Sequence, residues 1–224
     1  MLFAFMLALF GVLYTIYNEP LPTGASGRKA DALAQKMLAA IHYEDYRKTC
    51  YFEWSYAAGT HHYFWDKQKG KVHVNWSDNT VFLNLNDPKK SKVIENEKEV
   101  IGKSKKEFIE KAVSYFNNDS FWLVGPFKVF DKGTRRSIVK LDDGTDALLV
   151  KYTSGGTTPG DSYLWKLSET GLPESFRMWV DIIPIGGLEA TWDNWQVMES
   201  GVFLPTSHKF GPVHLDLGEV RAYN

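Results

Sequence analysis

The stretch KYTSGGTTPGDSYLWKLSETGLPESFRMW, from Lys151 to Trp179, has the clearest pattern of secondary structure in this chain. Its second half alternates apolar and polar residues on both sides of the segment Thr170-Gly171-Leu172-Pro173. Alternation of this kind places successive side chains on opposite faces of a β-strand, and a corner rich in Gly and Pro is typical of the turn between two strands. The stretch therefore predicts a hairpin of an antiparallel sheet with large apolar side chains on one face.

Four short strands joined by tight turns are predicted between Thr49 and Leu85. Aromatic and polar residues alternate throughout this segment, and Gly59, Gly70 and the pair Asp78-Asn79 interrupt the alternation. Short alternating strands separated by turn residues are typical of an antiparallel meander.

Two amphipathic helices are predicted on either side of the meander, one from Ala30 to Ile41 and one from Lys105 to Asn117. The run Asn117-Asn118-Asp119 predicts the end of the second helix. The apolar segment Phe121–Phe127, kinked by Gly-Pro, is expected to cross the mouth or edge of the sheet. Further turns are expected at residues 142–144, 154–160 and 185–187, and further strands through 190–196 and 202–210.

The first 17 residues, MLFAFMLALFGVLYTIY, carry no charge. As a helix they would span roughly 26 Å, which is within the range for a membrane span. The prediction is an uncleaved transmembrane anchor over residues 1–19, a linker over 20–27 and one domain over 28–224. A cleaved signal segment is the alternative, although the basic residues that usually precede its apolar core are missing. Either way we expect the domain to be exported to the periplasmic face of the cell envelope.

Composition limits the classes of function. The net charge is −1, from 26 basic and 27 acidic residues, so no overall field attracts a polyanion such as nucleic acid. Cys50 is the only cysteine, which excludes an intrachain disulfide and a multi-cysteine zinc site. We expect Cys50 to be a small buried residue of the first strand.

The order of elements resembles that of a known family. An amphipathic helix, a meander, a helix leading into NDSFWLVGPFKVFD and the hairpin YLWKLSETGLPESFRMW are similar to the LolA/LolB lipoprotein-carrier superfamily, with its relatives LppX and LprG. The similarity covers roughly Lys29 to Phe210. It implies an α+β fold in which a strongly curved antiparallel sheet forms a half-open β-barrel, helices pack on its concave side and acyl chains bind between them. An anchor over residues 1–17 departs from that pattern, because it would stop the protein from diffusing between membranes.

The function predicted from these features is non-catalytic binding or carriage of a hydrophobic ligand, a lipid or an acylated lipoprotein, with no cofactor. The membrane is the second expected partner, through residues 1–17. The ligand is expected to contact large apolar side chains, which serve equally well as solid core. The predicted ligand-binding residues are Phe52, Trp54, Tyr56, Trp76, Phe82, Phe121, Trp122, Tyr163, Trp165, Met178 and Val180.

The polar residues that could bind a metal ion or a charged ligand have simpler structural interpretations. His61 and His62 are adjacent on a strand and point to opposite faces, so they do not chelate one metal ion together. The acidic run Asp142–Asp146 is interpreted as a solvated hairpin turn rather than a calcium site. The lysines of residues 89–92 and 103–106 are interpreted as solvated, with contact to anionic lipid head groups as the alternative.

Two other classes of function stay open. A structural or interaction module of the envelope would have a packed core and an exposed aromatic patch or sheet edge. A hydrolase would need titratable groups that converge in a cleft, and Glu53 with Asp181 is the pair that a glycosidase would use. The sequence contains no nucleophile elbow, zinc-protease motif or phosphate-binding loop, so we predict that the protein is not an enzyme.

Overall fold

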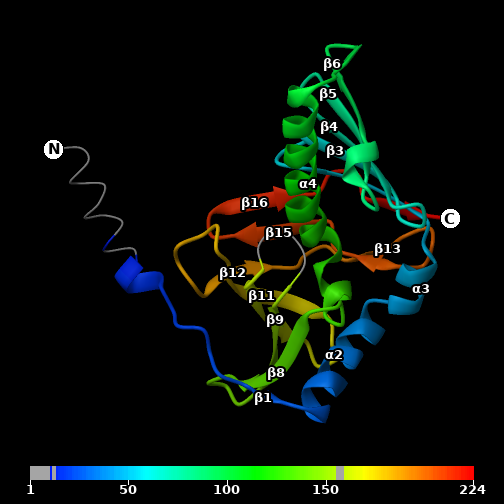
Figure 1. The fold of residues 1–224 in the computed structure, drawn as a ribbon. Coiled ribbons are helices and arrows are strands. Elements are labelled where there is room, and N and C mark those ends of the chain that lie inside the picture. The colour runs from blue at the N-terminus through cyan, green and yellow to red at the C-terminus, as the bar shows by residue number, and fades with distance from the viewer. Residues whose placement is uncertain (1–10, 12–13, 155–158) are drawn as a thin grey trace. The chain divides into compact units, whose positions relative to one another are not determined.

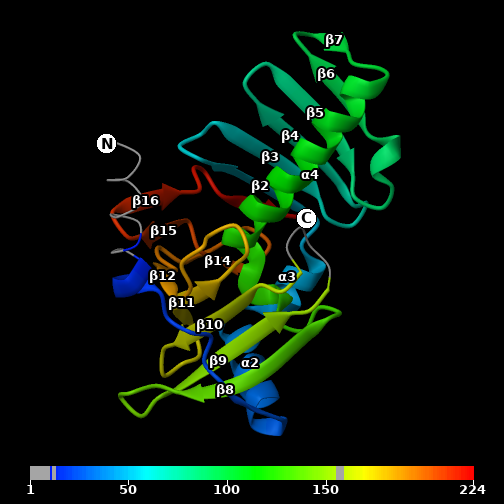
Figure 2. The same ribbon diagram turned by 60° about the vertical axis from the view of Figure 1, so that its left-hand side comes forward.

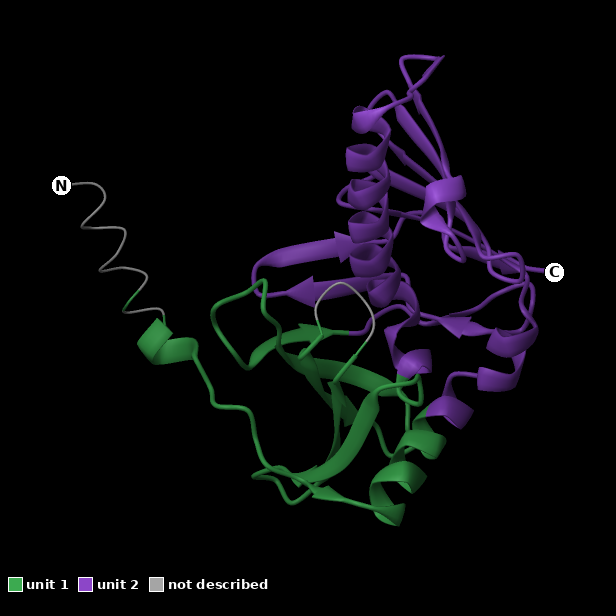
Figure 3. Cartoon of the chain, viewed as in Figure 1, with its two compact units in different colours: residues 1–37, 129–191 green, residues 38–128, 192–224 purple. Residues whose placement is uncertain are grey.

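The computed structural model describes residue 11, residues 14–154 and residues 159–224. The chain is an α+β protein with large antiparallel sheets (Figure 1). It divides into two compact units (Figure 3). Unit 1 contains residues 1–37 and 129–191, and unit 2 contains residues 38–128 and 192–224.

Most of the expected N-terminal apolar helix lies outside the described residues, and residues 14–17 are helical. Within the described ranges, the structure has no helix with the length and apolarity that crossing a membrane requires. Part of the expected linker is ordered on unit 1, because Ala25–Ser26 forms strand β1 and pairs with β8.

Unit 2 is built on a seven-stranded antiparallel sheet in the order β17-β2-β3-β4-β5-β6-β7 (Figure 2). The sheet has two edges, β17 and β7, and is therefore open. The predicted meander of four strands is confirmed as β2 to β5. The strands are β2 Tyr51–Tyr56, β3 His61–Asp66, β4 Lys71–Trp76, β5 Asn79–Asn84, β6 Lys92–Glu95, β7 Lys98–Glu99 and β17 Arg221–Tyr223.

Helix α4, Lys103–Val124, lies along one face of this sheet (Figure 2). The predicted end at Asn117-Asn118-Asp119 was wrong, because the helix continues to Val124 and is followed by the 3-10 turn Gly125–Lys128. Asp119 is buried and its carboxylate is hydrogen-bonded to the sheet, so a tertiary contact overrides the local tendency of Asn and Asp to end a helix. The segment expected to cross the mouth or edge of the sheet is instead the last turn of α4, up to Val124, and the 3-10 turn that follows it.

The rest of unit 2 consists of short elements. The expected strands over 190–196 and 202–210 are broken up. Asn194 in the first range has a positive φ angle of 51° that a strand does not allow, and Pro205 in the second has no N–H to donate to a neighbouring strand. Cys50 lies just before β2 and is partly exposed, so its expected place inside the strand was wrong. The short elements are α3 Tyr43–Lys48, the 3-10 turn Pro88–Lys90, β13 Gln196–Val197, β14 Phe203–Leu204, β15 Ser207–Phe210 and β16 Val213–Asp216.

Unit 1 contains the hairpin predicted on both sides of residues 170–173, and the prediction is confirmed. In the hairpin β10–β11, Trp165 pairs with Phe176, and both side chains are fully buried. The predicted first helix is α2, Arg28–Ala40, which buries Ala30 and Ala34. The strands follow the order β1-β8-β9-β10-β11-β12, with bounds β8 Thr134–Lys140, β9 Asp146–Tyr152, β10 Ser162–Leu167, β11 Pro173–Trp179 and β12 Leu188–Thr191.

Candidate functional site

The predicted ligand-binding residues are divided between the two units. Unit 2 contains those from the meander and from helix α4, and unit 1 contains those from the hairpin β10–β11 and its end. In unit 2 these are Phe52, Trp54, Tyr56, Trp76, Phe82, Phe121 and Trp122, and in unit 1 they are Tyr163, Trp165, Met178 and Val180.

In unit 2, the side chains that face α4 form what we call the aromatic wall. Strand pairing places these rings on one face of β2, β3 and β4. Three rings of helix α4 contact the aromatic wall. Phe108 stacks with Trp76 at 6.2 Å between centroids, Tyr115 meets Trp76 edge-on at 5.6 Å, and Phe116 meets Trp65 edge-on at 5.4 Å. The aromatic wall consists of Phe52, Trp54, Tyr63, Trp65 and Trp76, which are all buried.

Phe82 is separated from the other predicted residues of the meander. It is 39% exposed and lies on the face of the sheet opposite α4, because its neighbours Val81 and Leu83 are the buried ones. Phe121 and Trp122 are half-buried in the last turns of α4, and the Trp122 ring lies 5.2 Å from that of His208.

In unit 1, the predicted residues belong to a closely packed core. The rings of Tyr163 and Trp165 meet Phe176 edge-on at 5.2 and 5.1 Å. Met178 is buried beside its strand partner Tyr163, while Val180 follows the end of β11 and is half-buried.

A buried polar cluster that the sequence analysis missed joins α4 to the sheet of unit 2. The carboxylate of Asp119 is 1% exposed. It accepts hydrogen bonds from the hydroxyl of Tyr63 at 2.5 Å, from Nδ1 of His61 at 2.7 Å and from Nδ2 of Asn118 at 2.8 Å. Because the carboxylate only accepts when ionised, Nδ1 of His61 carries the proton. The ring of Tyr115 stacks on His61 at 4.0 Å and covers it.

The cluster keeps its tyrosines protonated. Burial, with the nearby charge of Asp119, raises the pKa of Tyr56 to about 12. The same two causes, in the same order, hold the pKa of Tyr63 far above its ordinary value. A tyrosine that stays protonated remains a hydrogen-bond donor, so the arrangement serves to hold a helix in place.

Two donors of the aromatic wall are left without acceptors. Among the described residues, Nε1 of Trp54 and Nε1 of Trp65 are buried and have no hydrogen-bond partner. Leaving a buried donor unsatisfied costs about 1–3 kcal/mol. The two indoles therefore mark the place in unit 2 where an added oxygen acceptor would be most favourable.

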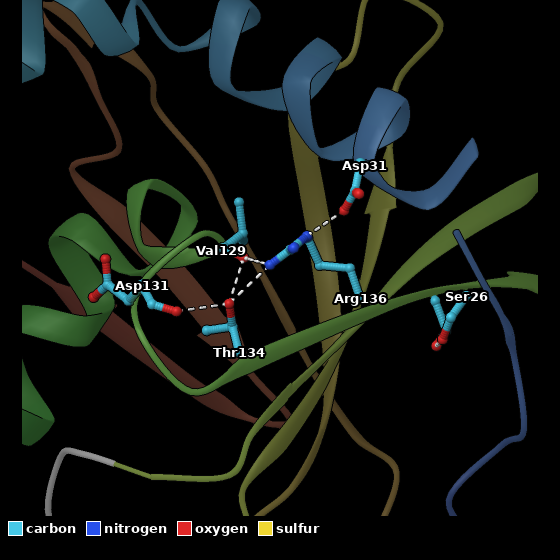
Figure 4. Close-up of polar contacts among 7 residues, drawn as sticks. Ser26, Asp31, Val129, Asp131, Thr134 and Arg136 are labelled. Carbon is cyan, nitrogen blue, oxygen red and sulfur yellow. Dashed lines mark hydrogen bonds and ion pairs between the residues drawn. The ribbon is translucent and has the colours of Figure 1, made fainter. Parts of the chain in front are cut away.

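A second polar cluster fixes α2 to the sheet of unit 1 (Figure 4). The guanidinium of Arg136 donates from Nε to Asp31 at 2.6 Å and from Nη1 to the carbonyl of Val129 and the hydroxyl of Thr134, both at 2.8 Å. Its Cζ lies 4.1 Å from the centre of the Phe130 ring. Asp31 stands in the first turn of α2, where a negative charge also complements the helix dipole.

Each unit also has a hollow on its surface. In unit 1 a hollow of about 370 Å³ is bordered by Glu19, Pro20 and Pro22 on one side and by the sheet on the other. The backbone carbonyl of Glu19 accepts from the Trp179 indole at 2.8 Å, which holds this N-terminal segment on the unit. In unit 2 a hollow of about 410 Å³ lies over the face of the sheet that α4 leaves open.

The carboxylates of Glu53 and Asp181, named as a possible glycosidase pair, belong to unit 2 and unit 1, respectively. Glu53 accepts a hydrogen bond from the Tyr223 hydroxyl at 2.7 Å and pairs with Arg221 at 3.3 Å. In the part of the chain that the structure describes, no group of three or more His, Cys, Asp or Glu side chains is placed to hold a metal ion.

No protein-family model matches this chain, and no curated protein matches it. The similarity to the lipoprotein carriers therefore stays a prediction from the order of elements and the quoted motifs.

Proposed function

We propose that this protein binds or carries a hydrophobic ligand, a lipid or an acylated lipoprotein, at the periplasmic face of the cell envelope, and performs no reaction on it. The ligand would lie between the aromatic wall and helix α4. The proposal includes a LolA/LolB-like half-open barrel whose concave side is covered by helices, and attachment to the membrane through residues 1–17.

The observation that carries the proposal is the pair of buried indole donors. An amphiphile offers apolar chain to the aromatic wall and a carbonyl or carboxylate oxygen to Nε1 of Trp54 or Trp65. A ligand that is both apolar and an acceptor therefore suits this face better than a pure hydrocarbon does.

Entry of a ligand would require α4 to separate from the wall, and the start of α4 is its weaker end. Gly102 at its N-cap position makes no side-chain cap, and no acidic residue stands in the first turn. Lys103, Lys105 and Lys106 instead place positive charge at the positive end of the helix dipole, which is unfavourable. The Asp119 cluster near the other end would serve as the pivot.

The test uses the full chain purified from membranes. Organic extraction followed by mass spectrometry is expected to show bound lipid, and the protein is expected to take up a fluorescent fatty acid. Trp54→Phe and Trp65→Phe each remove one indole donor with little change of shape, and each is expected to weaken binding by about three- to tenfold.

Trp195→Phe is the matched control. Its indole already donates to the carbonyl of Trp192 at 3.0 Å, so its loss is expected to leave fatty-acid affinity unchanged. A chain that carries no lipid and does not bind the fluorescent fatty acid contradicts the proposal. Equal affinity in the Trp54→Phe and Trp65→Phe variants and the native chain contradicts the assignment to the aromatic wall.

A further inference from the structure

A second set of aromatic rings lies on the open face of the unit 2 sheet, opposite α4. Each ring contacts the next, with centroids 5.4, 5.7, 5.2 and 4.7 Å apart along the series. We call this set the aromatic row. Its members, in order across the sheet, are Tyr223, Tyr51, Phe64, His73 and Phe82.

The aromatic row crosses five adjacent strands, from β17 through β2, β3 and β4 to β5. At about 4.8 Å between neighbouring strands, it extends over roughly 19 Å. None of its five rings is fully buried, and Phe82 is 39% exposed. A continuous series of rings on a water-facing sheet is not needed for the core of unit 2, which α4 and the aromatic wall already form, so it indicates a binding surface.

The hollow of about 410 Å³ lies over the middle of this row. Phe64 and His73 line it, together with the polar side chains of Glu53, His62 and Asn75. Glu219 completes the acidic part of the lining, and no Lys or Arg is among the described residues that line the hollow.

Two of these polar groups are held in position. The Tyr223 hydroxyl and Arg221 fix the carboxylate of Glu53. The hydroxyl of Thr80 donates to Oδ1 of Asn75 at 2.8 Å, which directs the two amide donors of Asn75 away from Thr80. Fixed acceptors and donors therefore stand beside the faces of the rings.

We propose that the aromatic row and its hollow bind a neutral or amino-substituted oligosaccharide. The apolar C–H face of a pyranose ring packs on an aromatic ring, and its hydroxyls donate to carboxylates and accept from amides. The length of the row suits an extended chain of several sugar rings.

Other ligands fit this face less well. The hollow has no lining Lys or Arg, and Arg221 beside it is already paired with Glu53, so it offers the phosphates of a nucleic acid no free cation. An acyl chain would remove the carboxylates of Glu53 and Glu219 from water without offering them a hydrogen bond. Burial lowers the pKa of His73, so its ring is neutral at neutral pH and acts as an aromatic surface.

The test is calorimetric titration of the full chain with chitohexaose, cellohexaose and maltohexaose. At least one is expected to bind, and saturation-transfer NMR is expected to show contact through the C–H protons of the sugar. Phe82→Ala and Phe64→Ala are each expected to lower the affinity about tenfold, and Glu53→Gln about threefold. Phe82 is the most exposed ring of the row, so its variant is the one expected to keep the native fold.

Ile101→Ala is the matched control, because Ile101 is an apolar side chain of unit 2 that is 78% exposed and lies outside the row. Its sugar affinity is expected to be that of the native chain. Absence of binding to all three hexasaccharides overturns the proposal, and so does equal binding by the folded Phe82→Ala variant. Binding of a single-stranded oligonucleotide that depends on Phe82 also overturns it, in favour of nucleic acid. The fatty-acid measurement concerns the opposite face of the sheet, so either proposal can fail without the other.

Discussion

The carboxylate of Asp119 connects α4 to two residues of β3 from a position with almost no exposure to water. A buried carboxylate is unfavourable unless its oxygens are hydrogen-bonded, and the partners Tyr63, His61 and Asn118 satisfy it. Replacing Asp119 removes the acceptor but leaves the donors buried. The loss in free energy of unfolding then comes from leaving these donors buried without an acceptor. That loss is larger than the net contribution of the hydrogen bonds themselves.

We therefore expect Asp119→Ala to lower the free energy of unfolding of unit 2 by about 2–4 kcal/mol, because the Tyr63 hydroxyl and the His61 ring lose their acceptor. Tyr63→Phe removes one donor together with its need for a partner, and is expected to cost only about 1 kcal/mol. Urea unfolding followed by far-UV circular dichroism measures both. A loss below about 0.5 kcal/mol in Asp119→Ala would show that the cluster does not hold the helix.

At the scale of elements, Arg136 attaches the first turn of α2 to β8 and to the loop that precedes it. The side chain of Arg136 is 18% exposed, whereas that of its partner Asp31 is 51% exposed. The ion pair itself is therefore largely screened by solvent, and most of the stabilisation comes from the bonds to Val129 and Thr134 and from the contact with Phe130.

Variants of Arg136 and Asp31 are therefore expected to destabilise unit 1 to different degrees. Arg136→Met is expected to destabilise the unit by about 2–3 kcal/mol and to speed amide hydrogen exchange in α2. Arg136→Lys is expected to recover only part of the loss, because an ammonium cannot reproduce the planar fork. Asp31→Asn is expected to cost under about 1 kcal/mol.

Lys140→Met is the control for this series. Lys140 forms an ion pair with Asp146 at 2.8 Å in the same unit, but both side chains are largely exposed. Its loss is expected to change stability by less than about 0.5 kcal/mol. If Arg136→Met had an equally small effect, the attachment of α2 would have to come from its apolar side chains alone.

Local sequence patterns were sufficient to predict some of the helices and strands, but not all of their ends. The hairpin β10–β11 and the strands β2 to β5 were predicted because alternation and turn residues are local signals. The end of α4 was predicted wrongly because Asn118 and Asp119 use their side chains in contacts with one another and with β3, which no local pattern reveals. Phe82 was grouped with the interior residues for its aromatic ring, although alternation with Val81 and Leu83 places it on the open face.

Pairings between segments that lie far apart in the chain could not be predicted from the sequence. Strand β17 pairs with β2, so Arg221 lies opposite Glu53, 168 residues away in the chain, and β1 pairs with β8 across 111 residues. Such pairings depend on which segments the folded backbone brings together. Closing a long loop leaves no periodic pattern in the sequence that would indicate the pairing. Four rings of the aromatic row lie on the predicted strands β2 to β5, where alternation alone places them on the open face, and only Tyr223 depended on the pairing of β17 with β2.

Net charge is a property of the whole chain, and it governs how strongly the protein binds a polyanion. With a net charge of −1 and an acidic lining beside the aromatic row, the native protein is expected to elute from heparin below about 0.15 M NaCl, since little counterion release is available. The double variant Glu53→Lys, Glu219→Lys places two cations beside exposed rings and is expected to gain salt-dependent binding to a single-stranded oligonucleotide. Retention of the native chain on heparin at higher salt would contradict this prediction. It would show that a local basic surface, such as the lysines at the start of α4, outweighs the net charge of the whole chain.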